Sequence, residues 1–384
     1  MNKRLHFIAI GGAAMHNLAL ALSQNGYLIS GSDDEIMEPS RTRLNIAGLL
    51  PESEGWFPEK ITTQLDGVVL GMHARKDNPE LLKALELGIP VFSFPEFLYE
   101  HAKNKQRVVI GGSHGKTTIT AMILHVLKKL SFDFDYMVGA KLDGFDTMVR
   151  LSDAPLIILE GDEYLSSPID LRPKFHLYQA DIGLISGIAW DHINVFPTYP
   201  FYVEQFKIFI DSIEPNGTLI YCEEDIDLKQ LALDATCMAL PYNVPKHTIV
   251  NGVTTIQMND LEYKLEIFGK HNLLNLKSAM MACNTLGIGD EEFLLAISSF
   301  TGAAKRLEKI KETDTIKIFR DFAHSPSKLK ATVKAAVEQF EGFNIIGVFE
   351  LHTFSSLNAN FLKEYARSMA GLDTAIVYYN SHVF

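Results

Sequence analysis

Residues 108–130 read VVIGGSHGKTTITAMILHVLKKL, and this stretch combines the patterns that decide the fold. It starts with an apolar run typical of a buried strand, continues with a glycine-containing turn, and ends with apolar residues at helical spacing. A strand that leads directly into a helix is the repeating unit of α/β proteins. The stretch therefore predicts a strand, a loop at the carboxyl end of that strand, and a helix.

The predicted loop has the composition of a phosphate-binding loop. Its residues after the strand are Gly112, Ser113, His114, Gly115, Lys116, Thr117 and Thr118. Glycines allow backbone conformations that turn N–H groups inward, and a helix N-terminus favours anions. We predict that Lys116 contacts the β/γ-phosphates of a nucleotide and that the Thr117 hydroxyl holds Mg²⁺. Ile110 replaces the first glycine of the longer consensus, so a plain glycine turn capped by threonine also fits.

Apolar runs alternate with helical patterns along the chain, which predicts an α/β fold with parallel sheets flanked by helices. A length of 384 residues favours two or three domains. We place the domains at residues 1–104, 105–300 and 301–384. The last of these is shorter than a typical domain of ~100–150 residues. We therefore expect the third domain to be partial.

Composition excludes several classes of function. The formal net charge of −12 disfavours general binding to nucleic acid or to an anionic membrane. No apolar run approaches the ~20 residues of a membrane span. The first residues, MNKRLHFIAIGG, resemble a signal peptide, but His6 and His16 interrupt the apolar region and favour a strand, turn and helix. The three cysteines lack metal-type spacing, so we expect reduced thiols in a cytoplasmic protein.

Further motifs occur in one order around the loop. They are HFIAIGGAAMHNLALAL with SGSDD before it, and EGDEY, WDHINVF, GKHNLLN, KRLE and DFAHSP after it. Together they resemble the Mur ligases, which are ATP-dependent amide-forming ligases of peptidoglycan precursors, and the resemblance covers essentially the whole chain. It implies three domains: a Rossmann-like UDP-sugar domain, a central P-loop ATPase domain and a Rossmann-like C-terminal domain, which is apparently incomplete here.

The resemblance is strongest to the branch that starts from UDP-N-acetylmuramate, and two activities compete within it. One ligase adds L-alanine, and the other adds the murein tripeptide L-Ala-γ-D-Glu-meso-diaminopimelate during recycling. Tyr164 in GDEY and Phe322 in DFAHSP favour the tripeptide ligase, because the L-alanine ligase usually has Ser and Tyr there. Addition of L-alanine remains the alternative. In either reaction ATP is implied to convert the carboxylate to an acyl phosphate, which the amine attacks.

A metal site is expected beside the phosphate loop. Glu160 ends the apolar strand PLIILE, and carboxylates at strand ends suit Mg²⁺, although a solvated strand end is the plainer interpretation. The resemblance makes His192 a second ligand beside Thr117, whereas a loop histidine that caps a turn is the alternative. We expect Asp162 and Glu163 either to support the metal ligands from behind or to be structural. They are not expected to act as a pair, since adjacent residues of a strand face opposite sides.

The resemblance assigns further roles. It implies that Lys116, His192, Lys207 and Arg306 take part in catalysis. Lys207 lies 15 residues after His192, where several Mur ligases carry a carbamylated lysine; an exposed helix lysine is the alternative. Asn272 and Asn275 are implied to contact adenine, although Asn272 could cap a helix. Arg306 and Asp321 are implied to approach ATP from the third domain, on the phosphate and the ribose.

The N-terminal region is implied to bind the UDP moiety. Gly11 and Gly12 follow a predicted strand, where N–H groups can hold a pyrophosphate, and Asp33 could bind ribose or uracil. HARKDNPE, residues 73–80, resembles a second UDP-sugar loop of the family, but Asn78-Pro79 fits a helix start equally well.

Three rival functions remain to be weighed. An NAD-dependent oxidoreductase would use only the first glycine turn and leave Lys116, His192 and Asn272 without a role. A folylpolyglutamate synthetase would carry its phosphate loop near the N-terminus. A non-catalytic sensor of UDP-sugar or ATP would not need the metal ligands. The expected partners are therefore UDP-N-acetylmuramate, an amino acid or murein tripeptide, ATP and Mg²⁺; no oligomeric state is predicted.

Overall fold

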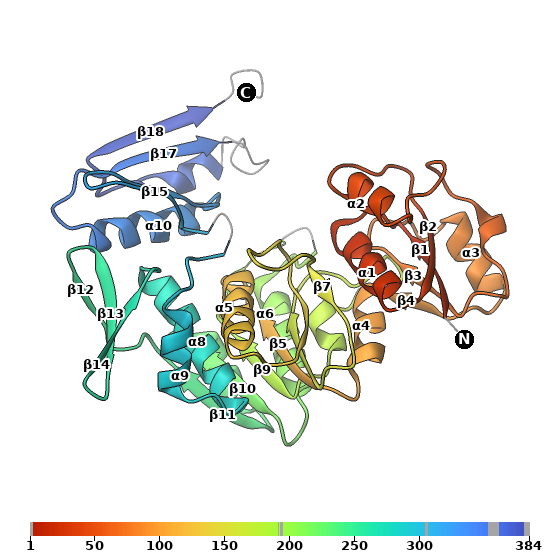
Figure 1. The fold of residues 1–384 in the computed structure, drawn as a ribbon, viewed down its shortest axis with the longest axis horizontal. Helices are drawn as coiled ribbons and strands as arrows, with labels where there is room; N and C mark the ends of the chain where they lie inside the picture. Colours follow the sequence, from red (N-terminus) through yellow and green to blue (C-terminus); the bar gives the residue numbers. More distant parts are fainter. Residues whose placement is uncertain (1–2, 191, 193–194, 304–305, 352–360, 380–384) are drawn as a thin grey trace. The chain divides into compact units, whose positions relative to one another are not determined.

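The computed structural model describes residues 3–190, 192, 195–303, 306–351 and 361–379. The chain forms two compact units, one of Met1–Thr120 with Ser131–Pro241 and one of Ala121–Leu130 with Tyr242–Phe384. Strands and helices alternate in both units (Figure 1), which confirms the α/β fold class. The division into three domains at residues 104 and 300 remains a prediction.

The first unit begins with a parallel sheet in the strand order β2-β1-β3-β4. Helices α1 and α2 lie on one side of this sheet and α3 on the other (Figure 1). The capping box of Ser93 and Glu96 starts α4 directly after β4. The elements are β1 (Arg4–Ile8), α1 (Ala13–Gln24), β2 (Leu28–Ser32), α2 (Ser40–Ile46), η1 (Pro58–Lys60), β3 (Gly67–Leu70), α3 (Pro79–Glu86), β4 (Val91–Ser93) and α4 (Phe94–Ala102).

A second sheet in the same unit has the order β11-β10-β9-β5-β8-β6-β7. Val109 of β5 and Ile158 of β8 are fully buried, as expected for a parallel sheet covered on both faces. The elements are β5 (Gln106–Gly111), α5 (Lys116–Lys129), β6 (Asp135–Met137), β7 (Val149–Arg150), β8 (Leu156–Glu160), η2 (Lys174–Leu177), β9 (Ile182–Ile185), α6 (Tyr199–Asp211), β10 (Thr218–Cys222), α7 (Ile226–Leu233) and β11 (Met238–Tyr242). From Ala121 onward α5 is assigned to the second unit, as is Tyr242 of β11.

Strand β5 lies at the point where the strand order of this sheet reverses. The strands β6 and β8 lie on one side of β5, and the later strands β9 and β10 lie on the other. The pairs β6–β8, β8–β5, β5–β9 and β9–β10 are all parallel. Ligands of such sheets bind in the crevice at the carboxyl ends of the strands beside this point. The fold therefore directs attention to the residues that follow β5, β8 and β9.

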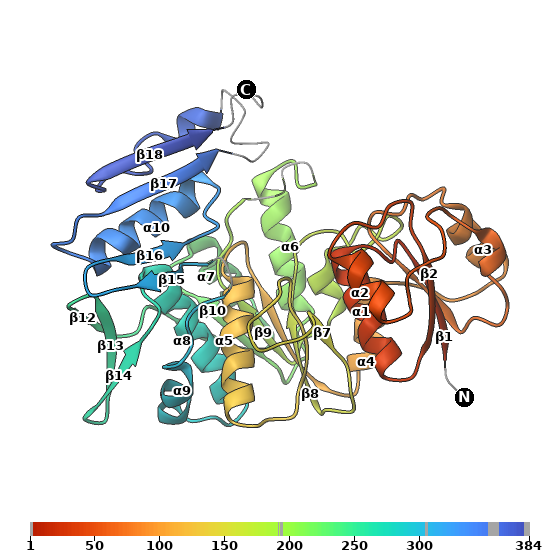
Figure 2. The same ribbon diagram turned by 45° about the horizontal axis from the view of Figure 1, so that its top comes forward.

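The second unit has an aromatic core. Phe268, Phe319 and Phe340 pack edge to face or tilted, with ring centroids 5.2–5.5 Å apart. Strands β17 and β18 run side by side and parallel (Figure 2). The elements are β12 (Thr248–Val250), β13 (Val253–Met258), β14 (Leu261–Leu265), α8 (Lys270–Thr285), α9 (Asp290–Ile297), β15 (Glu308–Glu312), β16 (Lys317–Arg320), α10 (Pro326–Gln339), β17 (Ile346–Leu351), η4 (Phe361–Tyr365) and β18 (Thr374–Tyr379).

Two predictions from composition can be compared with the structure. Within the described residues, none of the helices combines the length and the apolar character that crossing a membrane requires. Cys222, Cys237 and Cys283 are free and buried, as expected for reduced thiols.

Candidate active site

The phosphate loop forms the connection that the sequence predicts. Strand β5 ends at Gly111 and helix α5 begins at Lys116. Gly112 has a φ of 123°, and a Cβ atom there would lie 2.1 Å from the Ser186 hydroxyl oxygen. Gly115 also has a positive φ, of 82°. Only glycine suits this backbone, so the two glycines are structural requirements of the loop.

Hydrogen bonds hold the loop against the segment that follows β9. The Ser113 N–H donates to the Gly187 carbonyl at 3.0 Å, and the Ser186 hydroxyl donates to the His114 carbonyl. The Ala189 N–H donates to the Ser113 hydroxyl oxygen at 2.8 Å. Thr118, on the first turn of α5, is buried and anchors that end of the loop. The loop is thus held by contacts with the segment that follows β9.

Lys116 is paired with a carboxylate inside the site. Its ammonium group donates to the Gly112 carbonyl at 2.7 Å and to Glu163 Oε2 at 2.5 Å. Burial acts to lower the pKa of Lys116, but the carboxylates of Glu163, Asp162 and Glu160 outweigh it and hold this pKa above its usual value. The lysine therefore stays a cation and can neutralise phosphate charge.

Thr117 and Glu160 meet on the other side of the loop. The Thr117 hydroxyl donates to Glu160 Oε1 at 2.8 Å, and the Gly139 N–H donates to Glu160 Oε2 at 2.7 Å. Burial raises the pKa of Glu160 above its usual value despite these bonds and the nearby Lys116. The Glu160 carboxylate and the Thr117 hydroxyl together form an oxygen donor set that fits Mg²⁺. The nearby positive charge does not fully offset the burial of this carboxylate, and a bound cation would do so.

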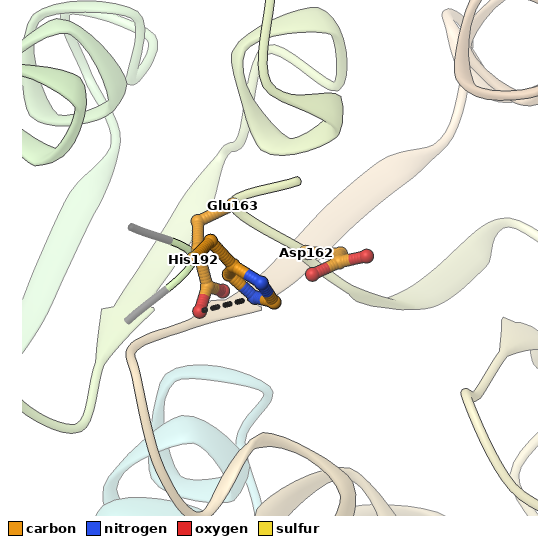
Figure 3. Close-up of side chains that lie close together, drawn as sticks. All are labelled: Asp162, Glu163 and His192. Atoms are coloured by element: carbon orange, nitrogen blue, oxygen red, sulfur yellow. Dashed lines mark ion pairs between the residues drawn. The ribbon is translucent and has the colours of Figure 1, made fainter. Parts of the chain in front are cut away.

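His192 is grouped with two carboxylates that were not expected to act as a pair. Single ligand atoms of Asp162, Glu163 and His192 all lie within 4.8 Å of one another (Figure 3). His192 Nε2 lies 3.8 Å from Glu163 Oε1. The expectation that Asp162 and Glu163 face opposite sides of a strand is wrong, because β8 ends at Glu160 and its alternation does not continue. Asp191, which precedes this histidine, lies outside the described residues.

Tyr164 and Lys174 extend the group formed by His192 and the two carboxylates. The ring of Tyr164 contacts the ring of His192 with centroids 5.1 Å apart. Lys174 donates to Asp162 Oδ2 at 2.6 Å. The charges of Lys174 and Lys116 overcome the effect of burial and hold the pKa of Asp162 below its usual value. Tyr164 and Lys174 thus belong to the same polar cluster as His192.

Lys207 does not contact the group formed by Asp162, Glu163 and His192 in any described interaction. It lies on α6, where its ammonium group pairs with Asp211 at 2.6 Å and its side chain is 45% exposed. Tyr202 of the same helix is fully buried and reaches Glu163. Five residues correspond to roughly 140° around a helix, so Lys207 projects from a different face. The structure gives the catalytic interpretation of Lys207 no support and agrees with an exposed helix lysine.

Four predicted nucleotide contacts lie in the second unit. Asn272 and Asn275 are buried on one face of α8, and the Asn272 amide donates to the Phe268 carbonyl at 3.0 Å. Gly269 occupies the N-cap of α8, so Asn272 is not the helix cap. Asp321 accepts hydrogen bonds from the Leu307 N–H and the Thr332 hydroxyl and so holds the turn that contains Arg306. Their contacts with ATP remain predictions.

The N-terminal sheet brings together the three residues predicted to bind the UDP moiety. The Gly11 N–H donates to Asp33 Oδ2 at 2.7 Å, and Gly12 is the N-cap of α1. A Cβ atom at Gly11 would lie 2.9 Å from the same carboxylate oxygen. Burial raises the pKa of Asp33 to about 6. The carboxylate therefore lies beside the glycine turn at the ends of β1 and β2.

The structure of residues 73–80 favours a helix start over a loop that binds the UDP-sugar. The Asn78 carboxamide oxygen accepts hydrogen bonds from Glu80 N at 2.9 Å and Leu81 N at 3.1 Å, which makes Asn78 the N-cap of α3. Glu80 is fully buried, and its Oε2 lies 3.2 Å from His6 Nε2. The segment starts a helix, and its contact with a UDP-sugar remains a prediction.

The structure brings two residues to the loop that were not predicted as part of it: Glu163 was given only a supporting or structural role, and Tyr202 was given none. Glu163 belongs to the motif EGDEY, just after the strand that ends at Glu160. This position at a strand end could have indicated that Glu163 takes part in the site. Tyr202 is one aromatic residue among several on α6, so nothing in its spacing distinguishes it from the core. The Tyr202 hydroxyl donates to Glu163 Oε1 at 3.3 Å and lies 2.9 Å from the Ser113 hydroxyl.

Comparison with known protein families gives two matches along the chain. Residues 4–106 match the Mur ligase family catalytic domain, and residues 110–283 match the Mur ligase middle domain. A UDP-N-acetylmuramate–L-alanine ligase of Clostridium kluyveri is 30% identical over 390 residues, covering 98% of this chain and 83% of the relative. One from Carboxydothermus hydrogenoformans is 28% identical over 386 residues, covering 97% and 81%.

Solved structures share the fold. A murein peptide ligase from Psychrobacter arcticus superposes with a TM-score of 0.72 at 22% identity, covering 100% of this chain and 86% of that one. A UDP-N-acetylmuramate–alanine ligase from Thermotoga maritima gives a TM-score of 0.72 at 22% identity, covering 99% and 86%. At these identities the likeness establishes the fold and does not separate the two activities.

Proposed function

The chain belongs to the Mur ligase family of ATP-dependent ligases that form C–N bonds, and we propose that it joins an amine to the carboxylate of UDP-N-acetylmuramate. The observation that carries this proposal is the pair of contacts around the phosphate loop. Lys116 contacts Glu163 on one side, and Thr117 contacts Glu160 on the other. Both lie at the carboxyl ends of β5 and β8, where such sheets bind ligands.

The proposed reaction proceeds in two steps. A carboxylate oxygen of UDP-N-acetylmuramate attacks the γ-phosphorus of ATP, which releases ADP and forms an acyl phosphate. The amine nitrogen then attacks the carbonyl carbon, a proton leaves the nitrogen, and phosphate departs with the original carboxylate oxygen. Lys116 and the loop N–H groups stabilise the negative charge of the transferring phosphoryl group.

We propose that Mg²⁺ accompanies ATP at this site. Thr117 and Glu160 would hold the ion, and His192 with Asp162 and Glu163 supplies a second group of donors. When bound, the ion screens phosphate charge. Glu160 is the residue whose surroundings fit it best, because burial raises the pKa of this carboxyl and a nearby divalent cation would favour its ionised form.

L-alanine is our first candidate for the amine. The Clostridium and Carboxydothermus relatives, at 30% and 28% identity, are both named as ligases for L-alanine. The murein tripeptide is the second candidate, because Tyr164 and Phe322 depart from the residues usual in L-alanine ligases. Tyr164 packs against His192, so its identity affects the surroundings of the reacting groups.

A competition experiment decides between the two amines. The protein is incubated with MgATP, UDP-N-acetylmuramate and equal concentrations of L-alanine and the tripeptide, and the product is identified by mass. The L-alanine adduct as the main product supports our first candidate, and the tripeptide adduct supports the second. Formation of neither amide, with UDP-N-acetylmuramate still bound, would favour a non-catalytic sensor and contradict the proposed reaction. We place the protein in the cytoplasm, where ATP is available and its buried thiols stay reduced.

A further inference from the structure

A continuous set of hydrogen bonds connects the phosphate loop with helix α6. The Ala189 N–H lies 2.8 Å from the Ser113 hydroxyl oxygen, which lies 2.9 Å from the Tyr202 hydroxyl. Tyr202 in turn contacts Glu163 Oε1 at 3.3 Å, and Glu163 Oε2 accepts from Lys116 at 2.5 Å. The set begins at one end of the loop, passes through α6 and returns to the lysine at the other end.

The carboxylate of Glu163 gives a direction to the hydrogen bonds described for this set. A carboxylate paired with an ammonium group can only accept, so the Tyr202 hydroxyl donates its single proton to Glu163. The Ser113 oxygen accepts from the Ala189 N–H and gives its own proton to the Tyr202 oxygen. Every donor then points along one path toward Glu163, and such aligned bonds strengthen one another.

These groups are shielded from water. Tyr202 is 0% exposed, Glu163 1% and Ser113 8%. In a buried setting a polar group that loses its partner costs more than an exposed one, because water does not replace the lost bond. The Tyr202 hydroxyl is therefore a buried hydrogen-bond partner of both Ser113 and the second oxygen of Glu163.

We propose that Tyr202 is a positioning residue for ATP binding, which acts through Glu163 on Lys116 and through Ser113 on the loop backbone. This inference rests on the proposed function in taking ATP as the nucleotide. Within the described residues, the Lys116 ammonium spends two of its three N–H donors on Gly112 and Glu163, and the third serves a phosphate. A fixed Glu163 holds the Lys116 ammonium group at the loop before ATP binds. Less conformational entropy of the lysine side chain is then lost on binding.

The chain supplies a matched control in Tyr178. Tyr178 and Tyr202 are both fully buried in the first unit. The Tyr178 hydroxyl, in contrast to that of Tyr202, has no hydrogen-bond partner among the described residues. A change of either tyrosine to phenylalanine removes one buried oxygen and keeps the ring. The two variants therefore separate the effect of this hydrogen-bond path from the effect of losing a buried hydroxyl.

The experiment compares Tyr202→Phe and Tyr178→Phe with the unchanged protein. Binding of MgADP is measured by calorimetry, the KM values for MgATP and UDP-N-acetylmuramate are measured in turnover, and thermal unfolding reports folding. We expect Tyr202→Phe to weaken MgADP binding and raise the KM for MgATP by about three- to tenfold, the effect of one hydrogen bond. The KM for UDP-N-acetylmuramate should stay within about twofold, and Tyr178→Phe should leave all three values within the same range.

A second variant keeps the inference open to refutation. If Ser113 and Tyr202 act through one path, adding Ser113→Ala to Tyr202→Phe should weaken MgADP binding less than Ser113→Ala does alone. Additive effects of the two changes would contradict a shared path. Unchanged MgADP binding in Tyr202→Phe, or an equal loss in Tyr178→Phe, would refute the positioning role.

The calorimetric measurement also separates this inference from the proposed function. Selective weakening of MgADP binding in a protein that forms no amide would sustain the role of Tyr202 and refute the ligase reaction. If the unchanged protein forms the amide and Tyr202→Phe binds MgADP normally, the ligase reaction is sustained and the role of Tyr202 is refuted.

Discussion

The ammonium group of Lys116 lies 2.5 Å from a carboxylate oxygen of Glu163, and the second oxygen of that carboxylate lies 3.8 Å from His192 Nε2. Glu163 therefore stands between the lysine of the phosphate loop and the histidine that follows β9. The loop is charge-compensated by the protein before a nucleotide binds. This arrangement explains how a buried lysine remains a cation beside three carboxylates.

Lys116→Ala should abolish turnover. The change removes the cation that stabilises the transferring phosphoryl group, so ADP production should fall by about 10²-fold or more. UDP-N-acetylmuramate is expected to bind the N-terminal sheet, so its affinity should stay within about twofold. ADP release and equilibrium binding of the UDP-sugar are measured on the same preparation. Loss of UDP-sugar binding in a variant that unfolds normally would contradict this division of tasks.

Lys207→Ala should leave activity nearly unchanged and serves as the lysine control for Lys116→Ala. Lys207 is 45% exposed and pairs with Asp211 on the same helix, an arrangement of small energetic value. We expect kcat within about twofold of the unchanged protein. Intact mass in a bicarbonate-equilibrated buffer should show an unmodified lysine. A carbamate adduct together with a large loss of kcat would restore the catalytic interpretation.

Glu80→Ala should destabilise the N-terminal sheet. Glu80 and His6 are both fully buried and 3.2 Å apart, and Glu80 Oε1 also accepts from the Phe57 N–H at 2.7 Å. Removal of the carboxylate leaves His6 Nε2 and this N–H without a hydrogen-bond partner, which costs about 1–3 kcal/mol for a buried polar group. Urea unfolding measures the loss. Glu86→Ala, an exposed change on the same helix, should stay within about 0.5 kcal/mol.

Asp33→Asn should change how stability depends on pH. Burial raises the pKa of Asp33 from 3.8 to about 6, so the folded protein binds this proton more tightly than the unfolded chain does. The stability from this proton is present below about pH 4 and is lost as the pH rises through about 6.

The free energy of unfolding of the unchanged protein, minus that of Asp33→Asn, should therefore fall by about 1–3 kcal/mol between pH 4 and pH 7. Denaturant unfolding across this range measures the difference. Asp77→Asn, an exposed change in the same sheet domain, serves as the control for loss of a carboxylate. A flat difference for Asp33→Asn would show that burial does not raise the pKa of this carboxyl.

The strand, loop and helix at residues 108–130 were predictable because local signals and the fold agree there. The left-handed conformation at Gly112 and the position of Glu160 at a strand end both follow from sequence patterns. The pairing of Gly11 with Asp33 follows from two neighbouring parallel strands that end at one edge. These features depend on residues close in sequence or on adjacent strands.

The remaining features depend on where a chain turns after an element ends. Asp162 and Glu163 were expected on opposite faces because the strand pattern was extended past Glu160, where β8 ends. The spacing from His192 to Lys207 could not show which face of α6 the lysine occupies, since the intervening segment is not helical throughout. Tyr202 reaches Glu163 only through the packing of α6 on the sheet, which no local pattern encodes.

Oxygen transfer from the substrate carboxylate to phosphate tests the central claim most directly. UDP-N-acetylmuramate labelled with ¹⁸O in its carboxylate is converted with MgATP and L-alanine, and in parallel with the murein tripeptide, and the released phosphate is analysed by mass. Formation of an acyl phosphate predicts that each phosphate released carries one oxygen from the carboxylate. Unlabelled phosphate released together with amide product would contradict carboxylate activation by ATP at this site.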